Sequence, residues 1–243
     1  MTKGNLFARV AARLPWVRRR ADKLSHRNAL ARLKAGGFAP ATIYDIGAYR
    51  AGWSRVASET FPHAAFVLFE ANADNAAQLR DFGHRHFIVA LADADGEKTF
   101  FLPRTGDVTG ASLYLENTSH YADENLLARN VATARLDTLV ATNGLPPADL
   151  IKIDVQGAEL DVIAGGTHAI DRCEALIAEL SFVDYNKGAP LLADAMAAIG
   201  RRGFRCIDIC ELHRTAAGEM LQADFLFVKP ALFAKLSAHA GLG

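Results

Sequence analysis

The chain has 243 residues, 51% of them apolar, and its 27 basic side chains balance its 27 acidic ones. Such a chain is typical of a soluble globular protein and is long enough for one large domain with an appendage. It contains no run of the roughly 20 apolar residues that a membrane-spanning helix requires, and arginines interrupt the N-terminus where a signal peptide would be apolar. The sequence therefore predicts a cytoplasmic protein.

Charge is distributed unevenly along the chain. Residues 1–34 carry ten Lys or Arg and one acidic residue, Asp22, so the rest of the chain holds 17 basic and 26 acidic side chains. Proteins that bind nucleic acid need cations on the docking face to meet the phosphates. The acidic body therefore argues against broad nucleic-acid binding.

The basic residues 1–36 are predicted to form a helical N-terminal extension, with two helices around Pro15. Its apolar positions have roughly helical spacing (Leu24, Leu30 and Leu33), and a glycine pair at 36–37 marks a helix end. We expect the main domain to cover residues 37–243. Either the extension is solvated and partly packed, or residues 1–34 contact an anionic membrane surface or an acidic partner peripherally.

From residue 42 on, short apolar strands alternate with helical stretches. The expected strands cover residues 41–47, 64–71, 85–93, 97–103, 150–155, 175–182, 204–212 and 223–230, and the expected helices cover residues 52–61, 72–83, 157–166 and 189–203. This alternation predicts a parallel sheet with crossover helices, and the last two strands, joined without a helix, require one antiparallel strand. The polar loop from Thr105 to Asn125 is expected to form a lid or a substrate wall.

A glycine turn, DIGAYRAGWS, follows the first strand. It matches the phosphate-binding loop G-x-x-x-x-G-K-[ST] except that Trp53 replaces the lysine, which argues against a nucleoside triphosphate. The dinucleotide motif G-x-G-x-x-G fails as well, because Tyr49 occupies the second glycine position. A strand, a glycine turn and a helix in this order still direct backbone N–H groups toward a ligand. The candidate cofactor residues of the turn are Asp45, Gly47, Ala48, Tyr49 and Gly52.

A second acidic residue, Glu70, ends the next strand, 25 residues after Asp45. A carboxylate there can accept both hydrogen bonds of a ribose diol, while Asp45 could meet a ligand ammonium group and the turn a ligand carboxylate. These features suit S-adenosylmethionine. Ala71 and Asn72 complete the candidate cofactor residues of this strand, and an ordinary solvated strand-end acid is the alternative for Glu70.

The third strand ends in ALADADG. Adenine commonly lies against the loop after this strand, so Leu91 and Ala92 are candidates for its wall. Asp93 could accept a hydrogen bond from the exocyclic amine of adenine. Local turn chemistry before Gly96 explains this acidic residue equally well.

The segment LIKIDVQGAE places charged residues on a buried strand. Lys152 and Asp154 alternate with isoleucines, so both side chains lie on one face, where they are unfavourable unless paired or at the open end of the strand. Glu159 lies in the first turn of the following helix, which favours an acidic residue. A structural Lys–Asp pair with a capping acid is the alternative interpretation.

Seven segments together resemble, in order and spacing, the FkbM family of S-adenosylmethionine-dependent methyltransferases: DIGAYRAGW, FEAN, ALADADG, ASLY, RLDTL, LIKIDVQGAE and QADFLFVK. The resemblance covers about residues 28–229, and IKIDV-x-GAE is its most specific part. It implies the class I methyltransferase fold, an α/β Rossmann-like sheet of seven strands, mostly parallel with an antiparallel last hairpin. It also implies O-methylation, commonly of sugar or polyketide hydroxyls. Tyr49 and Gln156 depart from the family, which often has asparagine and glutamate there.

Methyl transfer to oxygen requires alignment of the acceptor and removal of its proton. The candidate bases are Asp154 and Glu179, with Glu159 as a supporting acid, and Lys152 could orient a carboxylate or stabilise an alkoxide. His120, in the polar loop, is a further candidate, although a loop histidine is more often simply solvated. Several acidic residues at one edge of the sheet could also hold a divalent cation that binds a diol substrate. No metal site is predicted, however, because neither the acidic residues nor the cysteines have the spacing of a ligand set.

The leading hypothesis is thus an S-adenosylmethionine-dependent O-methyltransferase acting on a hydroxyl of a sugar, a glycan or another small-molecule acceptor. One alternative is an N- or protein-directed methyltransferase, which the lack of an Asn/Asp-Pro-Pro-Tyr-like segment after residue 154 disfavours. The other is a catalytically silent methyltransferase-like scaffold, against which the intact Asp45, Gly47, Glu70 and Asp154 argue. No sequence feature predicts an oligomeric state.

Overall fold

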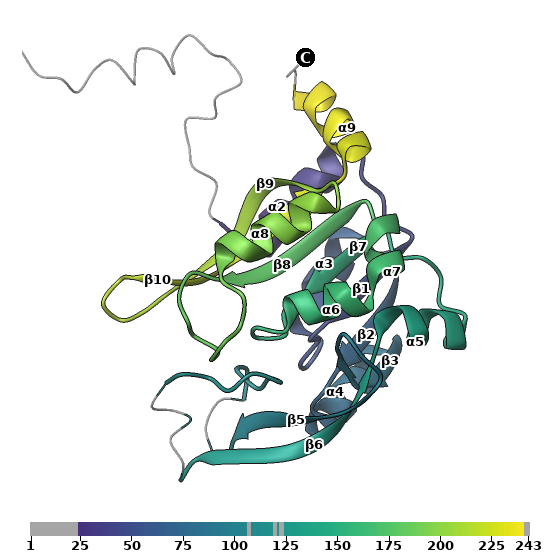
Figure 1. The fold of residues 1–243 in the computed structure, drawn as a ribbon. Coiled ribbons are helices and arrows are strands. Elements are labelled where there is room, and N and C mark those ends of the chain that lie inside the picture. Colours follow the sequence, from purple (N-terminus) through teal and green to yellow (C-terminus); the bar gives the residue numbers. More distant parts are fainter. Residues whose placement is uncertain (1–23, 106–107, 119–120, 122–123, 241–243) are drawn as a thin grey trace, which may run out of the picture.

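The computed structural model describes residues 24–105, 108–118, 121 and 124–240, and Figure 1 shows their arrangement. The predicted helix before Pro15 and the candidate His120 lie outside the described residues, and the second predicted helix is present in its described part, where it ends at the cap residue Gly36 as expected. Among the described residues, no helix combines the length and the apolar composition needed to cross a membrane.

Helices and strands alternate along most of the chain. The elements are α2 (His26–Ala35), β1 (Thr42–Ile46), α3 (Gly52–Thr60), β2 (Ala65–Glu70), η2 (Ala73–Asn75), α4 (Ala76–Phe82), β3 (Arg85–Ile88), β4 (Ala90–Leu91), β5 (Gly96–Pro103), β6 (Leu126–Ala134), α5 (Leu136–Asn143), β7 (Leu150–Ile153), α6 (Glu159–Gly165), α7 (Thr167–Arg172), β8 (Ala175–Ser181), α8 (Leu192–Arg201), β9 (Arg205–Arg214), β10 (Met220–Val228) and α9 (Pro230–Ala240).

The main sheet has seven strands in the order β3-β2-β1-β7-β8-β10-β9. The pairs among β3, β2, β1, β7 and β8 are parallel, whereas β10 runs antiparallel to both β8 and β9. The expected seven-stranded class I methyltransferase sheet, with its antiparallel last hairpin, is therefore confirmed. The strand order reverses between β1 and β7, and ligands of such sheets bind outside the carboxyl ends of the strands at this reversal.

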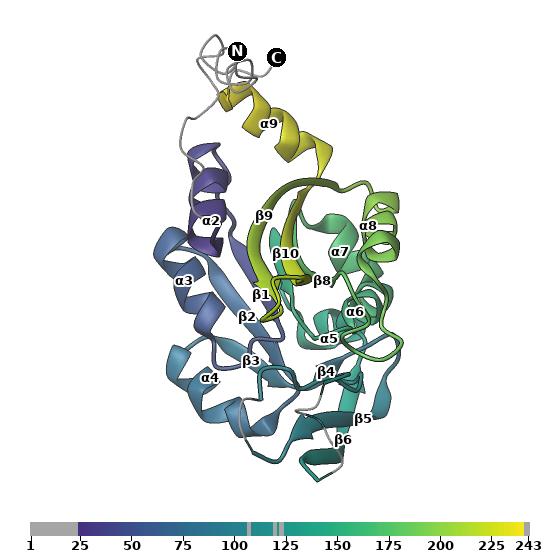
Figure 2. The ribbon, with the colours of Figure 1, turned by 90° about the vertical axis from the view of Figure 1, so that its left-hand side faces the viewer.

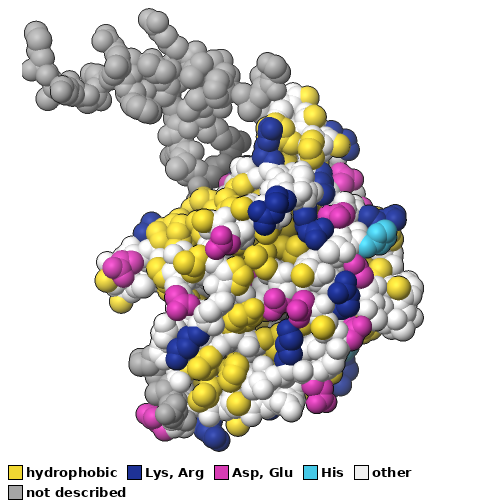
Figure 3. Space-filling view, viewed as in Figure 1, with side chains coloured by type: hydrophobic (Ala, Val, Ile, Leu, Met, Phe, Trp, Pro, Cys, Tyr) yellow, Lys and Arg dark blue, Asp and Glu magenta, His cyan; other side chains and the backbone are white. Residues whose placement is uncertain are grey.

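Two layers of helices cover the sheet. Figure 2 shows α2, α3 and α4 along one face and α5 to α8 along the other. The central strands are mostly apolar because both of their faces are buried: Tyr44 and Ile46 of β1 belong to the core under α5 to α8, and Ile43 belongs to the core under α2 to α4. In the view of Figure 1, hydrophobic side chains gather over α8 and the strands beside it, and acidic and basic side chains are interspersed elsewhere (Figure 3).

A second, three-stranded sheet, in the order β4-β6-β5, differs from expectation. The predicted third strand at residues 85–93 breaks at Val89, so that its second half, β4, leaves the main sheet. The hairpin arm at residues 97–103 is confirmed as β5, and its antiparallel partner is β6. The sequence did not predict β6, since this strand is only partly buried and forms through its pairing with β5 rather than through an apolar pattern.

Three helices were also not predicted. In α5, the β-branched Thr138 and Val140 lower the helix propensity, and α9 was not recognised after the last strand. The glycine pair after α6 was expected to end that helical region. The chain continues as α7 because the Asp137 carboxylate accepts hydrogen bonds from the backbone N–H groups of His168 and Ala169, both at 2.9 Å, which cap the new helix.

Helix α2 packs against the body of the protein. Its side chains Leu30 and Leu33 are 0% and 1% exposed and share one core with α3, β1 and β2. At its start, the Ser25 hydroxyl accepts a hydrogen bond from the Asn28 backbone N–H at 3.2 Å. The predicted boundary between residues 36 and 37 stays a prediction, but the helix before it contributes to the core beyond it.

The substitution Leu30→Ala is expected to lower the free energy of unfolding by about 2–5 kcal/mol, because it leaves a cavity in the core under α2. Leu24 precedes the same helix and is 41% exposed, so Leu24→Ala should change that free energy by less than about 0.5 kcal/mol. Urea unfolding of both full-length variants gives the comparison. Equal, small effects would contradict the packing of α2 into the core.

Candidate active site

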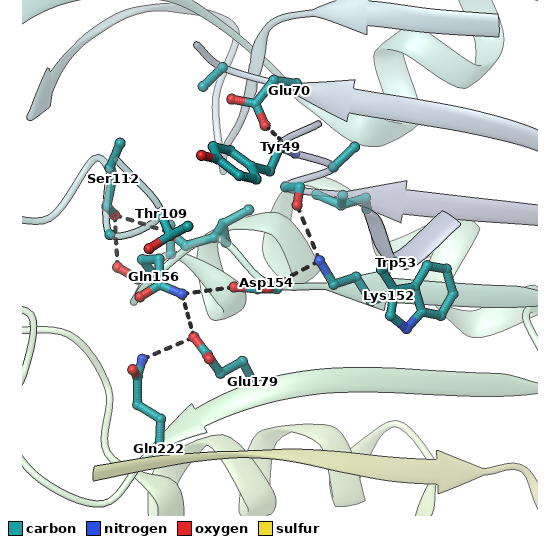
Figure 4. Close-up of a pocket in the computed structure, with 18 of the residues that line it drawn as sticks. Tyr49, Trp53, Glu70, Thr109, Ser112, Lys152, Asp154, Gln156, Glu179 and Gln222 are labelled. Carbon is teal, nitrogen blue, oxygen red and sulfur yellow. Dashed lines mark hydrogen bonds and ion pairs between the residues drawn. The ribbon is translucent and has the colours of Figure 1, made fainter. Parts of the chain in front are cut away.

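A cavity of about 840 Å³ opens at the carboxyl end of the sheet. Its lining comes from the ends of β1, β2, β7 and β8, from the β9–β10 hairpin, and from residues 108–113 of the predicted lid loop. Figure 4 shows the side chains that face it. The cavity lies where the order of the parallel strands reverses, as expected for a ligand site in this class of fold.

The buried ammonium group of Lys152 lies at the centre of the cavity floor. Its Nζ donates a hydrogen bond to the Gly47 carbonyl at 3.1 Å and lies 3.1 Å from Asp154 Oδ2 and 3.5 Å from Asp45 Oδ1. Burial disfavours the charged form of Lys152, but the carboxylates of Asp154 and Asp45 outweigh it and raise the pKa of Lys152 above its usual value. The predicted Lys152–Asp154 pairing is therefore present, at the open end of β7.

Asp45 makes contacts within the fold and does not line the cavity. It is fully buried, and its Oδ2 accepts a hydrogen bond from the Ser54 hydroxyl at 2.6 Å. Burial raises the pKa of Asp45, while the Lys152 charge and the Ser54 hydrogen bond oppose this rise. Its role is thus to balance Lys152, and the predicted contact with a ligand ammonium group is not supported by this position.

The glycine turn has no room for a side chain at Gly47. The backbone φ there is +74°, and a Cβ atom would lie 1.8 Å from the Asp154 carbonyl oxygen. The N–H groups of Gly47 and Ala48 both donate to the Phe69 carbonyl, at 2.9 and 3.1 Å. The N–H groups of Gly47 and Ala48 are therefore used within the fold. A ligand carboxylate would instead bind the N–H groups in the first turn of α3, which have no partner within the helix.

The two departures from the FkbM pattern, Tyr49 and Gln156, both have left-handed backbone conformations. Their φ angles are 48° and 55°. Asparagine tolerates this conformation better than most residues, so the asparagine expected from the family pattern would fit the backbone at the position of Tyr49 with less strain. The Tyr49 ring lines the cavity, and the Arg50 guanidinium lies 4.9 Å from its centroid.

Glu70 reaches the cavity from the end of β2. Its Oε2 accepts a hydrogen bond from the Tyr49 backbone N–H and its Oε1 one from the Asn72 N–H, each at 2.7 Å. Burial raises the pKa of Glu70 to about 7, although these hydrogen bonds oppose the rise. Oε1 also accepts a hydrogen bond from Asn75 Nδ2 at 3.4 Å, whereas Oε2 keeps a lone pair that can accept a ribose hydroxyl.

Of the other predicted cofactor residues, some line the cavity and some lie outside its lining. Ala71, Leu91 and Gly52 line the cavity. Asn72 instead caps η2, since its Oδ1 accepts from the Asp74 N–H at 3.1 Å. Ala92 is fully buried, and Asp93 pairs with Lys98 at 2.7 Å outside the lining. Further apolar surface that can hold adenine, beside Leu91, comes from residues that sequence reasoning did not select (Phe69, Val89, Ala90 and Phe100).

Gln156 connects the two predicted bases. Its Nε2 donates to Asp154 Oδ1 at 2.8 Å and to Glu179 Oε2 at 2.6 Å, and Glu179 Oε2 also accepts from Gln222 Nε2 at 3.0 Å (Figure 4). Burial and the neighbouring acidic groups, with Asp154 first among them, raise the pKa of Glu179 well above its usual value. The Ser112 hydroxyl donates to the carbonyl of Gln156 at 2.7 Å and so attaches the loop at 108–113 to this turn.

Glu159 lies behind the cavity rather than in its lining. Its Oε1 accepts from the backbone N–H groups of Val155 and Gly157, both at 3.1 Å. Burial raises the pKa of Glu159 to about 7, against these hydrogen bonds. It therefore positions the turn that carries Gln156, and the structure gives no contact that supports its predicted role as an acid at the reaction centre.

Sequence reasoning missed the residues of β9 and β10 that line the cavity beside Glu179. Asp224 of β10 is buried, and its Oδ2 lies 3.5 Å from His26 Nε2 and 3.6 Å from His213 Nε2. The signal was the segment QADFLFVK, in which Gln222 and Asp224 are polar residues on an otherwise apolar strand. His26 is far from Asp224 in the sequence, so no local pattern linked the two residues.

The model of the methyltransferase FkbM domain matches residues 45–206 of the chain. The chain belongs to the FkbM family of S-adenosylmethionine-dependent methyltransferases. The resemblance seen in the sequence motifs is thereby confirmed.

Two curated relatives are similar to this FkbM-family chain. AMB antimetabolite synthetase AmbE of Pseudomonas aeruginosa is 29% identical over 199 residues, covering 67% of this chain and 9% of that protein. The 2-O-methyltransferase NoeI of Sinorhizobium fredii is 32% identical over 160 residues, covering 60% of this chain and 65% of that protein. The chain thus spans less than two thirds of the length of either relative.

Among solved structures, the magnesium protoporphyrin IX methyltransferase ChlM of Synechocystis PCC 6803 has a TM-score of 0.48 and 11% sequence identity, covering 93% of this chain and 92% of that one. Precorrin-6y C5,15-methyltransferase of Geobacter metallireducens has a TM-score of 0.45 and 15% identity, covering 86% and 91%.

The cavity of this FkbM-family chain fits S-adenosylmethionine. Glu70 Oε2 has a lone pair that can accept a ribose hydroxyl, and Phe69 and Leu91 line the cavity with apolar surface that can hold an adenine. Among the described residues, five acidic side chains line the cavity against the basic Lys152 and Arg214. An excess of negative charge suits a cofactor that carries a sulfonium and an ammonium group.

The substitution Glu70→Gln is expected to weaken S-adenosylmethionine binding by about ten- to hundredfold, because hydrogen bonds to a charged acceptor are lost. Since the pKa of Glu70 is about 7, the wild-type affinity should fall as the pH is lowered through 7, when the carboxylate becomes protonated. The Gln variant should lack this dependence. Calorimetry between pH 6 and 8 gives both results.

Asp93→Asn is the control, because Asp93 lies outside the lining, and we expect its affinity to stay within about twofold of wild type. A Glu70→Gln variant with wild-type affinity would contradict the assignment of Glu70 to the ribose.

Proposed function

We propose that the chain transfers a methyl group from S-adenosylmethionine to a hydroxyl group of a sugar, a glycan or another small-molecule acceptor. The observation that carries this proposal is the continuity of one cavity from Glu70, the candidate ribose site, to the bridged carboxylates of Asp154 and Glu179. The name of the relative NoeI, a 2-O-methyltransferase, supports oxygen as the acceptor atom.

Asp154 is the residue proposed to take the proton of the acceptor hydroxyl. When bound, the cofactor supplies a methyl group that its positively charged sulfur activates toward displacement. The Asp154 side chain is 31% exposed, whereas Lys152 beside it is 5% exposed. Lys152 and Gln156 each hold one of its oxygens, which fixes the carboxylate in orientation while a lone pair of each oxygen remains for the hydroxyl.

Glu179 and Gln156 are proposed to position this base. The Gln156 amide has two N–H bonds, and it directs one to each carboxylate. A glutamate at position 156, as is common in the family, would place a third negative charge there. The glutamine instead joins the two acids through hydrogen bonds.

The far wall of the cavity supports a hydroxylated acceptor of moderate size. Tyr185, Leu212 and Leu221 contribute apolar surface, and His213 and Gln222 contribute polar groups. Pockets that bind small molecules commonly combine an apolar lining with a few polar groups that fix orientation.

A peripheral contact of residues 1–34 with an anionic membrane surface or an acidic partner stays a prediction. Within α2 the basic side chains have partners in the fold: Arg27 pairs with Glu59, Arg32 with Asp208, and Lys34 donates to the Thr60 carbonyl. Support for such a contact therefore rests on residues 1–23, which lie outside the described residues.

Methyl-labelled S-adenosylmethionine offered with a panel of hydroxylated sugars and glycans tests the proposal. We expect label to enter an O-methyl group, and Asp154→Asn to lower kcat by about 10²- to 10⁴-fold, as for the loss of a general base. Asp93→Asn should keep the wild-type kcat. Transfer to amines alone would contradict O-methylation, and an unchanged kcat in Asp154→Asn would contradict the role of Asp154.

A further inference from the structure

Three acidic side chains lie side by side across the last three strands of the sheet. Glu179 of β8 is directly opposite Asp224 of β10, and Asp224 is opposite Glu211 of β9. Directly opposed side chains have Cβ atoms roughly 4.5–5.5 Å apart, so like charges at such positions repel. Glu179 and Asp224 are also buried, at 6% and 4% exposure. A row of this kind is unfavourable unless a cation, or a proton on one of the acidic groups, balances it.

His213 borders this row at distances that suit a shared cation. Its Nε2 lies 3.6 Å from Asp224 Oδ2 and 3.7 Å from Glu179 Oε1. These separations are too long for N–H···O hydrogen bonds. They are close to the roughly 3.4 Å between two ligands bound about 2.1 Å from a tetrahedral ion. The three residues each present one ligand atom, and all three atoms lie within 4.8 Å of one another.

The other histidine, His26, is held as a donor instead. The Trp53 indole nitrogen, which can only donate, gives its hydrogen bond to His26 Nδ1 at 3.1 Å. In the neutral imidazole the proton is then on Nε2, which lies 3.5 Å from Asp224 Oδ2 and 3.7 Å from Glu211 Oε2. A protonated nitrogen cannot bind a metal ion, so His26 is not a ligand of the proposed ion.

Glu179 is oriented for the same position. Both amide donors that reach it, from Gln156 and Gln222, bind its Oε2, at 2.6 and 3.0 Å. Its Oε1 is therefore the oxygen left to face His213. Outer hydrogen bonds of this type commonly fix the ligands of metal ions in proteins.

We propose that Glu179, His213 and Asp224 bind a divalent transition-metal ion at the acceptor end of the cavity. One imidazole and two carboxylates suit Mn²⁺, Fe²⁺ or Zn²⁺, whereas Mg²⁺ and Ca²⁺ prefer oxygen ligands throughout. All three residues line the cavity, so further positions around the ion are open to it. For its role the inference rests on the proposed function: the ion would bind the acceptor oxygen and lower the pKa of its hydroxyl, so that Asp154 removes the proton more readily.

An ammonium group on a cationic acceptor would satisfy the same carboxylates without a metal. It differs from a metal ion in one respect, because it has no use for the lone pair of a histidine nitrogen. The effect of replacing His213 therefore separates the two ligands. This side chain is 41% exposed, so its replacement leaves the fold intact.

The test is titration of the chelator-treated full-length protein with Mn²⁺, without cofactor or acceptor, following the electron paramagnetic resonance signal of free Mn²⁺. We expect one saturable site per chain in the wild type. His213→Gln and Asp224→Asn should each weaken binding by at least about tenfold. Glu211→Gln is the matched control from the same row, outside the three proposed ligands, and should stay within about threefold of wild type.

The absence of saturable Mn²⁺ binding, or equal affinities of His213→Gln and wild type, would overturn the metal site. Calorimetry with S-adenosylmethionine in the same chelator keeps this result separate from the proposed function, since cofactor binding needs none of the three ligands. Methyl transfer at the full wild-type rate in chelator would overturn the role of the ion, even if the ion binds.

Discussion

The buried ammonium group of Lys152 holds together the two strand ends on which the rest of the site depends. Its hydrogen bond to the Gly47 carbonyl and its pairing with Asp154 join the exit of β1 to the exit of β7, at the reversal of strand order. The two exits approach so closely that only glycine fits at position 47. A charge in this position is stable only because the carboxylates of Asp45 and Asp154 balance it.

From this centre, hydrogen bonds extend to both ends of the cavity. On the cofactor side, the turn after Gly47 presents the Tyr49 N–H to Glu70. On the acceptor side, Gln156 links Asp154 to Glu179. Tyr49 and Gln156 both have positive φ angles, so the backbone at each exit is strained while its side chain or its N–H group faces a functional residue. Such strain is maintained only where the surrounding contacts outweigh its cost.

Much of this fold and site could be predicted from the sequence, because the central parallel strands are buried on both faces and therefore carry mostly apolar residues. The motifs around Gly47, Glu70 and Lys152 lie at the ends of such strands, where the fold brings them together. The strand β6 could not be predicted, since it is held by pairing rather than by burial. Asp224 and His213 could not be assigned either, because their chemistry depends on a register across β8, β10 and β9 that no local pattern specifies.

Two further misplacements have a physical cause. Asp45 was expected at the cavity wall, but a carboxylate beside a buried lysine is more stable as its counter-ion. Glu159 was expected near the reaction centre. Its carboxylate instead accepts hydrogen bonds from backbone N–H groups of the tight turn before α6. In both cases the acidic residue stabilises the fold, although sequence reasoning assigned it to the ligand or to the reaction.

Equilibrium unfolding of Lys152→Met, alone and combined with Asp45→Asn, tests the central role of the ammonium group most directly. The single substitution should lower the free energy of unfolding by about 3–5 kcal/mol, because it leaves the Asp45 carboxylate buried without a counter-ion. Adding Asp45→Asn should recover a large part of that loss. A Lys152→Met variant as stable as the wild type, or one that Asp45→Asn does not rescue, would contradict the account.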